Sequence, residues 1–208
     1  QLVQKLLNKG HKVYGLTRHP ERQGADGCRY LTLSALSKHN NPFDIVVNLA
    51  GENIAGGRWS KRRKKRLYDS RLTLTQNLKA QLATPPGIVI SMSAVGYYGM
   101  HSSVVFDEET DPRAGFTHDL CAAWEEAAMA FKQTGSRVCI LRSGVVLGNG
   151  GALAKMKPAF LCGFGGPIGK GDQWFPWIHI EDLLNLYEFC MTHDNISGVF
   201  NAVAPQAT

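Results

Sequence analysis

Short apolar runs alternate with longer amphipathic stretches along most of this chain. The runs predict strands at residues 12–17, 43–49, 88–92, 137–141 and 199–203. Apolar residues at helical spacing predict helices over residues 2–9, 60–83, 116–131 and 181–191. Strands that alternate with helices favour parallel pairing through right-handed crossovers, so we expect a doubly wound, Rossmann-like α/β sheet.

The order of elements also predicts how the chain divides. It opens inside a predicted helix, whereas a doubly wound dinucleotide-binding domain opens with a strand and a glycine-rich turn, so we expect both to be lacking here. Residues 1–150 are then an N-terminally incomplete NAD(P)-binding domain. We expect residues 151–208 to be a loop-rich, partly substrate-facing segment with a further helix and strand of the same fold, truncated at its C-terminal end. Within it, glycines crowd around Pro167 in residues 152–173, which is typical of a loop that closes over a ligand or of a surface connection.

The positive charge is confined to one short segment. The formal net charge is +6, and residues 61–66 are six consecutive cations, so the rest of the chain is neutral. Such local charge argues against a general nucleic-acid-binding surface. It is typical of a solvated, basic opening of a helix, with an anionic partner or the phosphates of a cofactor as the alternatives.

Cysteine and histidine usage indicates neither disulfides nor a metal centre. The five cysteines are scattered without a Cys-x-x-Cys pair, so we expect reduced and mostly buried thiols. The seven histidines are equally dispersed, and we predict no metal site. No apolar run approaches the ~18 residues of a membrane helix, and no secretory leader is visible. We therefore expect a cytoplasmic protein without a membrane partner.

The region with the clearest chemistry is residues 88–99, where an apolar strand runs into a loop rich in hydroxyl groups. In open α/β sheets, ligands bind beyond the carboxyl ends of the strands. We therefore predict a functional site at this junction.

Four segments in order resemble the extended, epimerase-like branch of the short-chain dehydrogenase/reductases. They are Asn48-Leu49-Ala50-Gly51, residues 91–99, residues 142–148 and residues 179–183. The sequence at Arg58-Trp59, at Ser70-Arg71 and over residues 165–169 and 176–180 is similar to that of an atypical subgroup called epimerase family proteins. These proteins are related to NAD-dependent epimerase/dehydratases. The resemblance implies a Rossmann-like fold, a glycine-rich phosphate loop before Gln1 and a substrate-binding segment after Thr208.

The resemblance also implies a dinucleotide cofactor. Gly51 would let the backbone approach a flat cofactor ring closely. Arg18 ends a strand where an acidic residue would bind the ribose of NAD and an arginine would accept the additional phosphate of NADP, so NADP is expected before NAD. A solvent-exposed arginine without this role is the alternative. The expected cofactor-binding residues are Thr17, Arg18, Leu49, Ala50, Gly51, Glu52, Arg71, Ser91, Met92, Arg142, Ser143, Gly144 and Val145.

The family's usual Tyr-x-x-x-Lys pair is absent. Counting back from Glu125 places Thr117 and Cys121 at those positions, and a threonine hydroxyl does not ionise usefully. Cys121 is more typical of a helix core than of a nucleophile.

Other side chains could replace the missing pair. Ser93 matches the catalytic serine, with Ser91 as the alternative register. His118, Tyr98 and Tyr97 are candidate proton donors, although an idle helix histidine and packing tyrosines are the simpler interpretations.

Substrate contacts are expected from Tyr97, Pro167, Trp177 and His179, because aromatic residues beside a glycine-rich loop suit stacking on a ring or sugar. A small hydrophobic cluster would explain the same aromatic residues. The acidic loop 107–111 is typical of solvated charge.

The sequence therefore predicts an NADP-binding oxidoreductase or epimerase-like enzyme. Its substrate would be a small polar carbonyl, hydroxyl or sugar-like molecule, with no nucleic-acid partner. The alternative is a dinucleotide-binding regulatory module that has lost turnover. The sequence does not identify the substrate or the oligomeric state.

Overall fold

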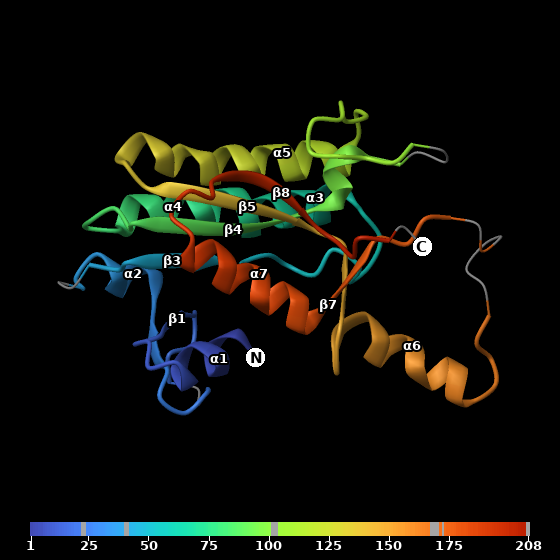
Figure 1. Cartoon of the computed structure of the whole chain (residues 1–208), viewed down its shortest axis with the longest axis horizontal. Helices are drawn as coiled ribbons and strands as arrows, with labels where there is room; N and C mark the ends of the chain where they lie inside the picture. The colour runs from blue at the N-terminus through green and yellow to red at the C-terminus, as the bar shows by residue number, and fades with distance from the viewer. Residues whose placement is uncertain (22–23, 40–41, 101–103, 167–170, 172, 207–208) are drawn as a thin grey trace.

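A four-stranded parallel sheet forms the centre of the computed structural model, which describes residues 1–21, 24–39, 42–100, 104–166, 171 and 173–206. Its strand order is β3 (Ile45–Asn48), β4 (Ile88–Ala94), β5 (Arg137–Ser143) and β8 (Gly198–Ala202). All four strands run in the same direction, as Figure 1 shows. The predicted Rossmann-like α/β class is confirmed.

The two faces of the sheet bury alternate residues of each strand, as the period of two requires. On one face, Ile88 and Ile90 pack with side chains of helix α7 (Ile180–Thr192). On the other, Val89 packs with side chains of α4 (Leu74–Gln81) and α5 (Phe116–Met129). Ser91 and Ser93 continue the second series, because both lie an even number of residues from Val89. This alternation directs both serines towards the α4 and α5 layer.

The predicted helix over residues 60–83 is one helical run with a distortion at its centre. It consists of α3 (Lys61–Tyr68), a π-helical turn (Asp69–Thr73) and α4. The Ser60 hydroxyl accepts a hydrogen bond from the Arg63 amide at 3.3 Å and so caps the basic first turn. The interpretation of residues 61–66 as a basic helix opening is confirmed.

Two separate two-stranded ladders accompany the central sheet. Helix α1 (Leu2–Asn8) precedes β1 (Tyr14–Leu16), which pairs with β2 (Arg29–Leu31) ahead of the short helix α2 (Leu33–Leu36). After β5, β6 (Val145–Leu147) pairs with β7 (Trp177–His179). The sequence pattern did not predict β2, α2, β6 or β7, because elements of three or four residues leave too short a periodic signal.

One loop prediction is wrong. Residues 151–161 form helix α6 (Gly151–Leu161), where we expected a loop over 152–173. The expectation weighed the later glycines and neglected the strong helix formers of the segment Ala-Leu-Ala-Lys-Met. Gly163, at φ +77°, then ends the helix in the left-handed region. Figure 1 shows α6 standing away from the main sheet.

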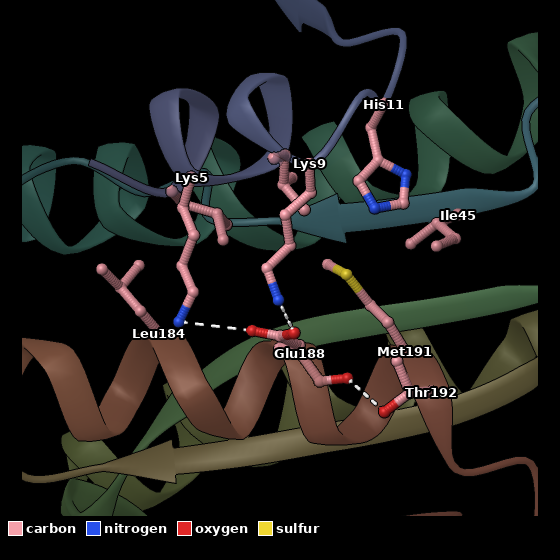
Figure 2. Close-up of a pocket in the computed structure, with 10 residues that line it drawn as sticks. Lys5, Lys9, His11, Ile45, Leu184, Glu188, Met191 and Thr192 are labelled. Atoms are coloured by element: carbon pink, nitrogen blue, oxygen red, sulfur yellow. Dashed lines mark hydrogen bonds and ion pairs between the residues drawn. The ribbon is translucent and has the colours of Figure 1, made fainter.

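A cleft of about 500 Å³ lies between α1, the start of β3 and α7 (Figure 2). Leu2, Leu6, Ile45 and Met191 contribute apolar walls. Across it, Lys5 and Lys9 of α1 form ion pairs with Glu188 of α7. The cleft borders the amino end of β3, so it is remote from the strand ends where the sequence predicts chemistry. In the described residues, no helix is long and apolar enough to span a membrane.

Candidate functional site

The carboxyl ends of three neighbouring strands bring the predicted polar residues together. Asn48 of β3 is paired in register with Ser91 of β4, and Ser93 of β4 with Arg142 of β5. All four side chains are buried. Because neighbouring parallel strands end at the same edge, residues about 50 positions apart in the sequence form one cluster.

Asn48 fixes the turn that follows β3. Its Nδ2 donates to Thr75 Oγ1 at 2.8 Å and to Ser91 Oγ at 3.4 Å, and its Oδ1 accepts from the Ala50 amide at 3.2 Å. The turn itself is open to solvent: Leu49 is 52% exposed and Gly51 is exposed. Glu52 is half-buried and pairs with Arg63 and Arg66 of α3.

A buried ion pair lies directly behind Ser93. Arg142 donates to Glu125 of α5 through Nε at 2.9 Å and through Nη2 at 2.8 Å, and the Ser93 hydroxyl donates to the same carboxylate at 2.6 Å. Burial alone would lower the pKa of Arg142. Its hydrogen bonds to Glu125 and Tyr98 outweigh burial and raise that pKa above the ordinary arginine value. Ser93 is 1% exposed, so its hydroxyl proton is bonded to Glu125 and does not reach solvent.

Two adjacent tyrosines have different surroundings. The Tyr98 hydroxyl is buried; it accepts from Arg142 Nη1 at 2.9 Å and donates to Asn201 Oδ1 at 2.8 Å. Tyr97 is half-buried, and its ring covers the Arg142 guanidinium, with Cζ 3.4 Å from the ring centroid. Tyr98 is thus part of the buried network, whereas Tyr97 lies at its outer side.

His118 stands beside Tyr97 at the start of α5. Its Nδ1 lies 2.8 Å from the Tyr97 carbonyl oxygen, and the two rings are 4.9 Å apart. A carbonyl oxygen only accepts, so Nδ1 carries a proton and donates it. The other ring nitrogen, Nε2, is then the one that can exchange a proton with a ligand.

The two positions that replace the tyrosine–lysine pair also face the serine loop. A Cβ built on Gly96 would lie 3.5 Å from Thr117 Cβ, which places Thr117 against this loop. The Cys121 thiol is buried and lies close to Ser93. Burial, followed by the charge of Glu125, raises the pKa of Cys121, so this thiol is poorly suited to be a nucleophile.

Several expected site residues lie outside this cluster. Thr17 and Arg18 follow β1, on the separate two-stranded ladder. Met92 points to the opposite face of the sheet, where its sulfur accepts from the Tyr187 hydroxyl at 3.1 Å.

The other predicted site residues outside the cluster lie in the second half of the chain. Val145 begins β6, and its amide donates to the Pro176 carbonyl at 2.8 Å beside Gly144. Trp177 begins β7, and His179 caps α7 by accepting from the Glu181 amide at 3.3 Å. Pro167 lies outside the described residues.

Sequence reasoning did not assign a role to Glu125, Asn201 or Thr75, although all three hold site residues. For Glu125 a signal existed. Cys121, Trp124 and Ala128 mark the buried face of α5 at spacings of three and four, and Glu125 falls on that face. A carboxylate in such a place requires a partner.

Among the described residues, no group of three or more histidine, cysteine or acidic side chains could hold a metal ion.

Comparison with known protein families matches residues 1–202 to the NAD dependent epimerase/dehydratase family. Epimerase family protein Mb2239 of Mycobacterium bovis is 43% identical over 164 residues, which are 78% of this chain and 54% of that protein. Mouse epimerase family protein SDR39U1 is 38% identical over 215 residues, covering 100% of this chain and 71% of its own length. The chain thus spans about half the length of the mycobacterial relative.

Solved structures agree with the family match. Human epimerase family protein SDR39U1 (isoform 2), crystallised with NADPH, superposes with a TM-score of 0.88 at 36% identity. It covers all of this chain, which spans 70% of the human one. A nucleoside-diphosphate sugar epimerase from Corynebacterium glutamicum superposes with a TM-score of 0.82 at 31% identity, over 100% of this chain and 44% of that protein.

Proposed function

Because the chain belongs to the NAD dependent epimerase/dehydratase family, we propose that it forms the cofactor-binding framework of an NADP-dependent oxidoreductase or epimerase-like enzyme. The observation that carries this proposal is the turn after β3. There, exposed Leu49 and Gly51 stand at the carboxyl edge of the parallel sheet, beside the buried Ser93 cluster. Ligands of open α/β sheets bind at such an edge.

The residues present fit a dinucleotide. Leu49 directly follows the buried Asn48 yet is 52% exposed, and with exposed Gly51 it offers a flat apolar surface on which a ring could lie. Arg18 is exposed just beyond β1, which suits the additional phosphate of NADP. The NADPH bound by the similar human protein supports this choice over NAD.

When bound, the nicotinamide would supply or accept a hydride at a substrate carbon. We assign the matching proton to His118 in its imidazolium form: Nδ1–H stays bonded to the Tyr97 carbonyl, the proton on Nε2 passes to the carbonyl oxygen as the alcohol forms, and a neutral ring remains. Ser93 and Tyr98 already donate to Glu125 and Asn201, so toward a substrate their oxygens could only accept. We propose that these two hydroxyls hold the site in place.

The substrate is proposed to be a small polar carbonyl, hydroxyl or sugar-like molecule. Tyr97 would contact it beside His118, and residues 151–208, with Pro167, Trp177 and His179, would provide the rest of its surroundings. The expected cytoplasmic location and the expected absence of a nucleic-acid partner stay predictions from the sequence.

The cofactor assignment is tested by titrating NADPH and NADH into the full-length protein and following binding by calorimetry. We expect NADPH to bind more tightly. Arg18→Ala should reduce that preference about tenfold, the scale of a charge-assisted contact to phosphate. Lys12→Ala, an exposed cation before the same strand, is the matched control. Equal or tighter binding of NADH to the wild type would exclude the NADP assignment.

Turnover is tested by following the loss of NADPH absorbance over a panel of small carbonyl compounds. His118→Ala should lower the rate by about 10²-fold, as expected for a positioned proton donor, whereas His193→Ala should not. An unchanged rate in His118→Ala removes the histidine from the mechanism. Ser93→Ala should also lower the rate, because the loop after β4 loses the hydrogen bond that holds it. An unchanged rate in Ser93→Ala would exclude a role for Ser93 in the mechanism.

A second candidate function is a dinucleotide-binding regulatory module without turnover. The specific observation in its favour is that the Ser93 and Tyr98 protons are bonded within the protein, while Thr117 and Cys121 replace the usual catalytic pair. Tight NADPH binding without oxidation across the carbonyl panel would favour this module over the enzyme.

A further inference from the structure

The turn formed by residues 48–52, hereafter the glycine turn, is held by side chains of a single helical run. Thr75 of α4 bonds Asn48 at its beginning. Arg63 and Arg66 of α3 pair with the Glu52 carboxylate at its end. Between these two attachments lies the π-helical turn of residues 69–73, a rare distortion that often occurs at functional sites.

Two consecutive residues of this π turn hold both backbone groups of Glu52. The Ser70 hydroxyl accepts from the Glu52 amide at 3.0 Å and donates to the Leu67 carbonyl, also at 3.0 Å. Arg71 Nη2 donates to the Glu52 carbonyl oxygen at 3.0 Å. Arg71 Nη1 donates to Leu67 O and Ser70 Oγ, each at 3.3 Å, so the guanidinium is itself fixed by the helix.

Arg71 also occupies the space that a side chain at Gly51 would need. A Cβ built on Gly51 would lie 2.8 Å from Arg71 Cζ and 2.9 Å from Nη2, closer than such atoms approach. The guanidinium also lies over the Trp124 ring, with its Cζ 5.1 Å from the ring centroid. A Cβ at Gly51 would therefore point at Arg71, and the glycine makes room for the arginine.

We propose that Ser70 and Arg71 are positioning residues that hold the glycine turn in the orientation in which its exposed side receives the cofactor. This inference rests on the proposed function. It reassigns Arg71 from a direct cofactor ligand to a clamp on the turn. It also reassigns the need for glycine at position 51 from close approach of a ring to close packing of a guanidinium.

A double-mutant cycle on NADPH affinity in the full-length protein tests the clamp. Gly51→Ala and Arg71→Ala should each weaken binding about tenfold, since each displaces the turn. In the Arg71→Ala background, Gly51→Ala should weaken binding by no more than about threefold, because the clash has gone. Gln76→Ala, an exposed change on the same helical run, is the matched control. If Gly51→Ala costs the same factor in both backgrounds, the clamp is refuted.

Amide hydrogen exchange without cofactor gives a second, independent measurement. Ser70→Ala removes the acceptor of the Glu52 amide and should speed its exchange about tenfold, while the Val46 amide within β3 keeps its rate. Unchanged exchange of Glu52 in Ser70→Ala would overturn the clamp, whatever the cofactor. Failure of the wild type to bind NADPH would instead contradict the proposed function, and the exchange result would still decide the role of Ser70.

Discussion

Removing the Glu125 carboxylate should destabilise the fold strongly, because it leaves a buried charge without its partner. In Glu125→Ala, the charged Arg142 side chain stays buried, at 4% exposure, but has lost the carboxylate that neutralises it. The Ser93 hydroxyl also loses its hydrogen-bond acceptor. Breaking a buried ion pair from one side costs about 3–5 kcal/mol, and an orphaned buried hydroxyl adds about 1 kcal/mol. The expected loss of unfolding free energy is therefore about 4–6 kcal/mol.

For a domain of this size, such a loss corresponds to a fall in Tm of about 8–24 °C. Urea unfolding followed by circular dichroism measures the free energy, and a thermal scan measures Tm. Glu126→Ala is the matched control, because this neighbour on α5 is exposed and should change the stability by less than about 0.5 kcal/mol.

The double variant Glu125→Leu with Arg142→Met separates charge from packing. Replacing both partners of a buried ion pair by apolar residues of similar volume is often close to neutral, so the pair of changes should cost less than Glu125→Ala alone. The reasoning is refuted if Glu125→Ala melts within about 2 °C of the wild type. It is equally refuted if the double variant is less stable than Glu125→Ala.

Three further predictions concern other parts of the chain. Gly144→Ala should cost about 1–3 kcal/mol in urea unfolding, since its Cβ would lie 2.5 Å from the Pro176 carbonyl oxygen, whereas Gly150→Ala meets nothing within 4 Å. The arginines that bond the Glu52 carboxylate, Arg66 first, outweigh its partial burial and hold its pKa below the ordinary glutamate value, so this group stabilises the fold at neutral pH and ceases to do so as the pH falls through the lowered pKa. Glu52→Gln should therefore flatten the acid limb of the stability curve, and an unchanged limb would contradict the ion pairs. A thiol reagent should modify exposed Cys162 in the native protein, while the three buried thiols react only after unfolding, as peptide mass spectrometry would show.

The strands could be predicted from sequence because burial on both faces leaves continuous apolar runs, such as residues 88–90 and 138–141. Helices α1, α3, α4, α5 and α7 could be predicted because their apolar faces repeat at helical spacing, whereas α2 and α6 were not predicted. The π turn could not: Asp69–Thr73 continues the helical pattern on both sides, and the distortion lies in the backbone hydrogen bonds, which the spacing of residues does not reveal. Likewise, β2 has only three residues, too few for a periodic signal, whereas its partner β1 lies inside the strand predicted over residues 12–17.

The position of the serines was predictable, but the state of their hydroxyl groups was not. The resemblance located the loop after β4, and the strand period directs both Ser91 and Ser93 to the α4 and α5 side. Whether a hydroxyl there reaches a ligand depends on which residue of α5 lies opposite. In this chain that residue is Glu125, which binds the Ser93 proton and is itself held by Arg142, 17 residues further along the chain. A motif of residues around Ser93 contains no information about Glu125 or Arg142. A serine that matches a catalytic position can therefore be a buried hydrogen-bond donor within a structural network.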